Sequence, residues 1–119
     1  MRDFRQLKVW HKAHELALEV FKATQLFPRE ETYGLACQLR LAVTSIPSNI
    51  AEGTGRGSKS ELKQFMVIAS GSVCEVDYQV LLACELGYIS EEVRLRLQEQ
   101  ITEVKKMLMT YIRRIETTL

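Results

Sequence analysis

Glycine, hydroxyl and basic side chains are concentrated in one stretch of the sequence, residues 53–63. Amide hydrogens at the start of a helix, together with Arg56, Lys59 and Lys63, can hold one phosphate of a nucleic-acid backbone. A phosphate loop that hydrolyses nucleotides has the spacing Gly-x-x-x-x-Gly-Lys-Ser/Thr directly after a β-strand, whereas here a serine separates the last glycine from the lysine. The stretch therefore indicates phosphate contact without hydrolysis, and a capped turn with solvated charges is the simpler alternative.

Arg40 lies earlier in the chain, on the polar side of the helical pattern that precedes the glycines. It could pair with Glu52 or with a carboxylate of a neighbouring subunit, and this is the role we expect. It could instead join the basic residues of the glycine-rich stretch. The candidate nucleic-acid-binding set is then Arg40, Arg56, Lys59 and Lys63.

Two histidines, His11 and His14, are three residues apart in a helical pattern, with Glu15 beside them. Two such ligands can share one metal ion, but no His or Cys elsewhere stands at a matching spacing. Diiron bundles need Glu-x-x-His pairs, which the sequence lacks. No nucleophile can be paired with a base either. We therefore predict no metal site, no cofactor and no catalytic residues, and we expect a protein that is not an enzyme.

The three cysteines, Cys37, Cys74 and Cys84, are widely spaced and include no Cys-x-x-Cys pair. We expect buried, reduced thiols, which are typical of a reducing compartment. The first residues contain no apolar run of signal-peptide length, and no later stretch approaches the ~20 apolar residues of a membrane span. The sequence therefore predicts a cytoplasmic protein without membrane contact.

Composition is ordinary for a folded protein, with 46% hydrophobic and 26% charged residues in a chain of 119. This length suits a single domain, residues 1–119. The formal net charge of +1 argues against a strong global field, although the first half of the chain is the more basic. General electrostatic coating of nucleic acid is therefore not expected, and a local basic patch remains open.

Apolar residues recur at steps of three and four along the whole chain, which predicts helices and no strands. The predicted helices span residues 3–26, 35–53, 58–87 and 90–119. Capping boxes indicate two of the starts, Asp3 with Gln6 and Ser58 with Glu61. Gly87 suits the end of the third helix. The expected fold is all-α, an antiparallel up-down-up-down four-helix bundle.

Pro47 falls inside the second predicted helix, where it lacks an amide hydrogen and its ring crowds the carbonyl four residues earlier. Because Ile46 and Ile50 keep the helical spacing across it, we expect a proline kink rather than a new element. Asn49 and Glu52 lie one turn apart beside this point. We expect them to bond freed backbone groups or to bridge helices.

The third predicted helix carries two apolar rows. One row, from Leu62 to Ala83, alternates steps of four and three without a miss, as a heptad seam does. The second row comprises Val67, Gly71, Cys74, Tyr78 and Leu81. One bundle core covers one face, so the second row predicts an interface with other copies of the chain; a wide face within one chain is the alternative.

Three segments carry a resemblance to a known family. They read FRQLKVW at 4–10, YGL at 33–35 with QLR at 38–40, and SIPSNIAEG at 45–53 followed by Gly55-Arg56. Together they resemble the four-helix-bundle proteins of the 23S rRNA-intervening-sequence family, relatives of the accessory variability determinant protein of diversity-generating retroelements. The resemblance extends over nearly the whole chain. It implies a bacterial bundle that assembles as a barrel-like homopentamer, and the retroelement relatives bind nucleic acid and a reverse transcriptase.

Two functions are compatible with these observations. The first is a non-enzymatic homo-oligomer, expected to be a pentamer, that acts as an accessory module by binding RNA, DNA, a ribonucleoprotein or a reverse transcriptase-like protein. The second is a purely structural or protein–protein assembly factor without direct nucleic-acid contact.

Overall fold

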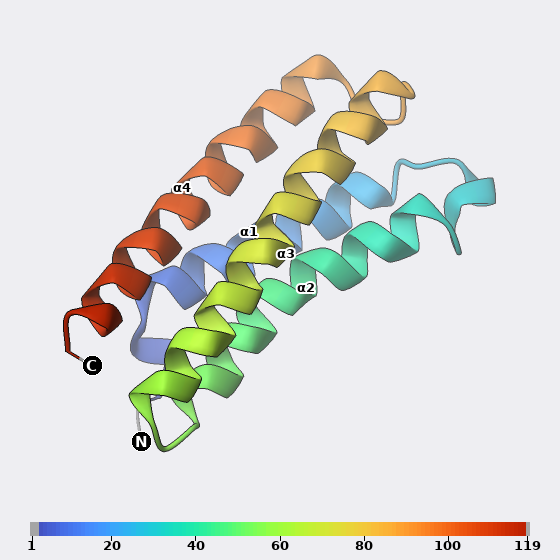
Figure 1. The fold of residues 1–119 in the computed structure, drawn as a ribbon. Coiled ribbons are helices and arrows are strands. Elements are labelled where there is room, and N and C mark those ends of the chain that lie inside the picture. Colours follow the sequence, from blue (N-terminus) through green and yellow to red (C-terminus); the bar gives the residue numbers. More distant parts are fainter. Residues whose placement is uncertain (1–2, 119) are drawn as a thin grey trace.

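Four long helices packed in a bundle make up most of the chain (Figure 1). The structure is a computed structural model and describes residues 3–118. Its elements in chain order are the 3₁₀ turn η1 Phe4–Gln6, α1 Lys8–Thr24, the 3₁₀ turn η2 Arg29–Glu31, α2 Leu35–Thr54, α3 Lys59–Glu85 and α4 Glu91–Glu116. The described residues contain no strand. The all-α class and the four helices are therefore confirmed.

The start of the chain differs from the single helix that was predicted. Asp3 caps only η1, where its carboxylate accepts a hydrogen bond from the amide two residues on. Leu7 is extended, with φ −90° and ψ 124°, and α1 begins at the next residue. This break places the rings of Phe4 and Trp10 in contact, with centroids 4.8 Å apart. In one continuous helix, residues six apart would lie about 120° apart around the axis. The predicted capping box at the start of the first helix is wrong, because Asp3 caps η1 and α1 begins at Lys8.

Three further helix boundaries follow from local chemistry, as predicted: the start of α3, the end of α3 and the start of α4. The Ser58 hydroxyl accepts a hydrogen bond from the Glu61 amide at 3.1 Å, which caps α3. Gly87 has a φ of +80°, a left-handed conformation that costs glycine little and lets the chain leave α3. The Ser90 hydroxyl accepts from the Val93 amide at 3.1 Å and caps α4.

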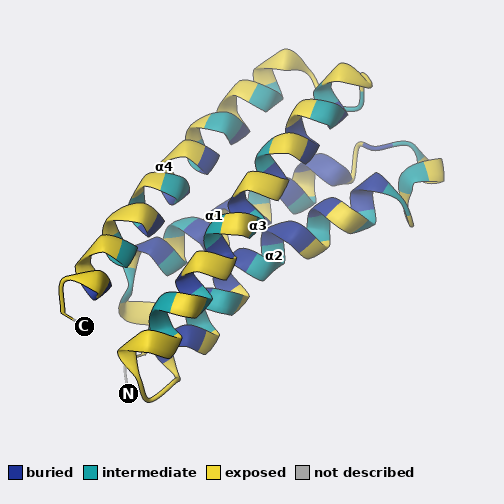
Figure 2. Ribbon diagram, viewed as in Figure 1, coloured by how far each residue is buried: buried dark blue, intermediate teal, exposed yellow. Residues whose placement is uncertain are grey.

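One continuous hydrophobic core lies between the four helices (Figure 2). The predicted seam of α3 forms its centre. Its residues Met66, Ala69, Val73, Val76, Val80 and Ala83 are all 0% exposed. Leu62, the first residue of that seam, packs against the core while partly exposed.

The helix α2 continues through Pro47 without interruption, and Pro47 is buried. Continuation of the helix across the proline is therefore confirmed, while the kink stays a prediction. Asn49 donates to the Ser45 carbonyl at 2.7 Å, which gives that backbone group a side-chain partner. The Ser45 hydroxyl lies 2.8 Å from that of Ser72 and joins α2 to α3.

The two ends of the bundle carry different features (Figure 1). The turn between α2 and α3 lies at the same end as the described N- and C-terminal residues. The turn between α3 and α4 lies at the opposite end, where η2 also lies. Basic residues near the α2–α3 turn are therefore close to the chain's terminal segments.

One helix, α3, is long and apolar enough to cross a membrane by length and composition alone. The expectation that no stretch approaches a span is therefore wrong for this helix. Its most apolar window is 33% buried inside the bundle, and the core helix of a soluble protein passes the same test. The absence of membrane contact stays a prediction.

Candidate nucleic-acid interface

Three of the four candidate basic residues lie together around the α2–α3 turn. Arg56 pairs with Glu52 at 3.1 Å and with Glu61 at 3.7 Å. Lys59 donates to the backbone carbonyl of Thr118 at 3.4 Å. The side chains in these contacts are exposed, and ion pairs between exposed side chains add little to the stability of a fold.

Lys63 completes this turn cluster, which we define as Arg56, Lys59 and Lys63. Its amine lies 2.9 Å from a carboxylate oxygen of Glu116, near the end of α4. A phosphate approaching the cluster would compete with the carboxylates of Glu52, Glu61 and Glu116. The turn cluster is thus a set of cations that are already paired but remain accessible.

Arg40 lies apart from the turn cluster. Its Nε donates to the Thr24 hydroxyl at 2.8 Å, and its guanidinium lies over the Phe21 ring at 4.8 Å. From Arg40, α2 runs on for fourteen residues to Thr54, about 21 Å along the axis, before the turn that carries Arg56. Arg40 therefore joins the start of α2 to the last turn of α1, and no ion pair links it to Glu52 within residues 3–118.

The glycine-rich stretch is a connection between two helices. The hydroxyl of Ser58 is engaged in capping α3, and no strand precedes the stretch within residues 3–118. A nucleotide-hydrolysing loop requires that strand. Gly53 has a different role, because a Cβ at this position would lie 2.8 Å from the Cβ of Phe65. This glycine allows α2 and α3 to approach each other closely just before the turn.

All five residues of the second α3 row are exposed. They are Val67, Gly71, Cys74, Tyr78 and Leu81, and the exposed fraction is 49% for Val67 and 62% for Tyr78. We call this row the outer row of α3. The alternative in which one chain covers both rows does not apply to this structure. Exposed apolar area of this kind, continuous along a helix, is typical of protein interfaces.

None of the three cysteines is buried, contrary to expectation, and all three are free thiols. Cys74 is exposed because it belongs to the outer row. Cys84 is partly buried, and its thiol donates to a Glu91 carboxylate oxygen at 3.2 Å. Burial, followed by the hydrogen bond to Glu91, raises the pKa of the Cys84 thiol above its ordinary value.

The two histidines each contact neighbouring groups of the chain. His14 stacks on Trp10, with centroids 4.9 Å apart and planes 9° from parallel. A ring nitrogen of His11 contacts the backbone carbonyl of Arg5. Within residues 3–118, no group of three or more His, Cys, Asp or Glu side chains could hold a metal ion.

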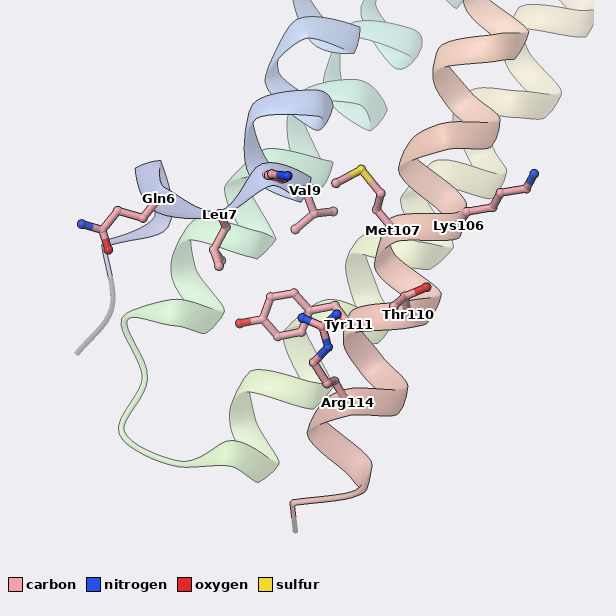
Figure 3. A pocket seen from close by; sticks show the side chains of 9 residues that line it. Gln6, Leu7, Val9, Lys106, Met107, Thr110, Tyr111 and Arg114 are labelled. Carbon is pink, nitrogen blue, oxygen red and sulfur yellow. The ribbon is translucent and has the colours of Figure 1, made fainter.

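A groove of about 470 Å³ lies between the start of α1 and the last turns of α4 (Figure 3). Its apolar lining includes Val9 and Met107, and its basic lining comprises Lys8, Lys106 and Arg114. In Figure 3, Arg114 lies beside Tyr111, whereas the side chain of Lys106 extends away from the groove. The sequence shows these α4 cations only as part of a solvated face.

A second groove, of about 450 Å³, lies between α1 and α2. Four of its lining residues are ring side chains, Phe4, Trp10, His14 and Phe21. The sequence pattern places Trp10 and Phe21 on the core face of a helix, and periodicity alone does not separate a buried position from the edge of a groove. This aromatic groove was therefore missed by sequence reasoning.

Comparison with known proteins identifies relatives of the fold. The sequence model of the 23S rRNA-intervening sequence protein family matches residues 5–110. The chain is also similar to the crystal structure of a protein with unknown function from the S23 ribosomal protein family of Bacteroides thetaiotaomicron VPI-5482. The two share 24% sequence identity with a TM-score of 0.81, over 87% of this chain and 97% of that chain. At this identity the likeness shows the fold alone. No curated protein sequence matches the chain.

Proposed function

The chain belongs to the 23S rRNA-intervening sequence protein family, and on that premise we propose that it is a non-enzymatic oligomer that binds nucleic acid or a ribonucleoprotein as an accessory module. The helices alternate in direction, up-down-up-down, and the assembly is a homopentamer in the cytoplasm. Its partners are RNA, DNA or a reverse transcriptase-like protein.

The exposed outer row of α3 is the observation that carries this proposal. Three large apolar or aromatic side chains of this row are exposed to solvent: Val67, Tyr78 and Leu81. Covering these side chains with another copy removes apolar area from water, at about 25 cal/mol per Å². Self-association is therefore favourable by the same effect that forms the core.

Assembly also explains how weak cationic sites become a binding surface. In one subunit, carboxylates offset Arg56 and Lys63 of the turn cluster, and Lys59 contacts a backbone carbonyl. In a ring of identical copies, the cluster repeats once per subunit on the same end of the bundle. Each contact with a phosphate releases counterions, so contacts that are weak singly add up over the ring.

A salt series tests the nucleic-acid part of the proposal. Binding of a labelled single-stranded RNA or DNA, followed by anisotropy, should weaken steeply as salt rises. The double substitution Arg56→Glu and Lys59→Glu should weaken it further at every salt concentration. A matched control, Lys22→Glu with Arg29→Glu, changes the same charge at the other end of the bundle and should have the smaller effect. Absence of binding at low salt would refute nucleic-acid contact.

A protein–protein assembly factor is the second candidate, and the ion pairs of the turn cluster favour it. Arg56 and Lys63 are each within 3.1 Å of a carboxylate oxygen, so phosphate contact must displace a partner. Under this alternative the outer row binds other proteins, and pull-down of a partner after nuclease treatment would support it.

A further inference from the structure

The aromatic groove between α1 and α2 has walls of two kinds. On one side stand the rings of Phe4, Trp10, His14 and Phe21. On the other side, α2 contributes Pro47, which is buried, and the hydroxyl-bearing Ser48, which is exposed. The groove therefore offers flat apolar faces within reach of hydrogen-bonding groups.

The spacing of two of these rings suits a flat ligand. His14 and Phe21 are seven residues apart on α1, which places them about 10.5 Å apart along the helix axis. Between them on the helix lie Ala17, whose side chain is small and buried, and Leu18, whose half-exposed side chain borders the same groove. A ring held between two aromatic side chains needs about 9 Å or more, since stacked centroids lie about 4.5–7 Å apart. The axial spacing between His14 and Phe21 therefore matches the thickness of one planar ring, with the Leu18 side chain at its edge.

The Trp10 and His14 rings form a stack that such a ring would extend. They are nearly parallel, 9° apart, with centroids at 4.9 Å. His14 is exposed, so part of its ring is accessible to a ligand. Leu18, on the same helix, is 51% exposed and borders the groove without being covered by any other part of the described chain.

Positive charge lies at both ends of the groove. The Arg5 guanidinium is 4.4 Å from the Phe4 ring centroid, and the Arg40 guanidinium is 4.8 Å from that of Phe21. Arg5 also pairs with Asp3 at 3.3 Å, whereas Arg40 forms no ion pair with any residue between 3 and 118. No acidic residue lines the groove. The charge and the flat faces together complement an anionic ligand that carries aromatic rings.

We propose that this groove binds unpaired bases of a single-stranded nucleic acid, which stack on the aromatic rings while Arg40 and Arg5 contact the flanking phosphates. The inference rests on the proposed nucleic-acid function and names its ligand class. Bases in a duplex are stacked on both faces and cannot enter, so the groove selects single strands. An apolar helix of a second copy fits less well, because it would bury the Arg40 charge without supplying an anion.

The only tryptophan of the chain, Trp10, lies in this groove and reports on it directly. A short single-stranded oligonucleotide should quench its fluorescence in a saturable titration. The same strand annealed into a duplex should not, and neither should an abasic oligomer of equal length, which has the phosphates without the bases. Quenching by the duplex or by the abasic oligomer at equal concentration would overturn the inference.

Substitution of the facing ring gives a second readout. Phe21→Leu keeps apolar volume and removes the aromatic face, and should weaken single-strand binding about tenfold. Tyr33→Leu removes an aromatic ring that is 95% exposed outside the groove and should leave binding unchanged. Circular dichroism melts confirm that both variants fold.

The remaining outcomes separate this inference from the function on which it rests. If anisotropy shows binding of a labelled strand while Trp10 emission and the Phe21→Leu affinity do not change, the groove is not the site and the proposed function stands. If no strand binds at low salt, both fail. If Trp10 emission shifts on dilution without nucleic acid, a second copy covers the groove and the inference is overturned.

Discussion

The hydroxyl of Tyr88 donates a hydrogen bond of 2.8 Å to a carboxylate oxygen of Glu31, 57 residues earlier in the chain. The other oxygen of Glu31 accepts from the Leu35 amide at 2.9 Å. One carboxylate thus caps the start of α2 and ties it to the turn between α3 and α4. The Tyr88 ring also packs on Phe27, with centroids 5.3 Å apart, and helps to close this end of the core.

Tyr88→Phe should lower the melting temperature by a few degrees, because it removes this long-range hydrogen bond and keeps the ring contact with Phe27. Thermal melts followed by circular dichroism measure the change. Tyr33→Phe removes a hydroxyl from a side chain that is 95% exposed and is the matched control. Equal melting temperatures for both variants would show that the Tyr88 bond contributes nothing.

Glu31 should make stability depend on pH on the acid side. The Leu35 amide first, and then the Tyr88 hydroxyl, hold the pKa of Glu31 below its ordinary value of 4.5. A carboxyl whose pKa is lowered by folding stabilises the fold above its unfolded pKa. This stabilisation is lost as pH falls from about 4.5 through the lower folded value. In urea unfolding between pH 7 and pH 3, Glu31→Gln should lose less stability than the wild type, and an identical pH profile would contradict this.

Gly53→Ala should destabilise the subunit by about 1–3 kcal/mol, the usual cost of forcing an extra group into a packed contact. The added Cβ would lie 2.8 Å from Phe65 and 2.9 Å from Met66. Gly71→Ala is the matched control within a helix, since nothing in its own chain lies within 4 Å of its Cβ position. Because Gly71 belongs to the outer row, both glycine variants are measured in the Tyr78→Asp background, in which the copies should not assemble. Because alanine has a higher helix propensity than glycine, the Gly71→Ala variant should be at least as stable as the parent protein, with a gain of up to about 1 kcal/mol. Chemical unfolding curves measure the free energy of unfolding of both variants. A Gly53→Ala variant that is more stable than Gly71→Ala would show that the close approach of α2 and α3 is wrong.

Tyr78→Asp should dissociate the oligomer that we propose, because it places a charge within the outer row of α3. Light scattering should give a mass near five times 13.7 kDa for the wild type and a smaller mass for the variant. Leu95→Asp changes an equally prominent apolar side chain on α4, 52% exposed, and should not alter the mass. A wild-type particle of 13.7 kDa at micromolar concentration would refute self-association.

Features that depend on neighbouring residues could be predicted from the sequence. Ser58, Gly87 and Ser90 set helix boundaries through bonds to residues within one turn, so their types and positions were enough. The buried seam of α3 could also be predicted, because apolar residues that alternate at spacings of four and three lie on one face of a helix.

Features that depend on contacts between distant residues could not. The break at Leu7 brings Phe4 onto Trp10, a ring contact that no capping rule contains. Pairing of Lys63 with Glu116 likewise requires the end of α4 to lie beside the start of α3. Among the candidate basic residues, Arg40 contacts Thr24 and Phe21 of α1, and sequence spacing does not reveal these partners.

The subunit is 45 Å long, and this length sets the height of a cyclic particle built through the outer row of α3. The outer row runs along the length of α3, so neighbouring subunits would pack side by side with their long axes parallel. Adding a subunit would increase the diameter of the particle and leave its height unchanged. All the α2–α3 turns would then lie on one rim and all the η2 turns on the other. The two ends of such a ring would differ chemically, one carrying the α2–α3 turns and the other the η2 turns. A long, chain-like ligand could therefore bind one end in preference to the other.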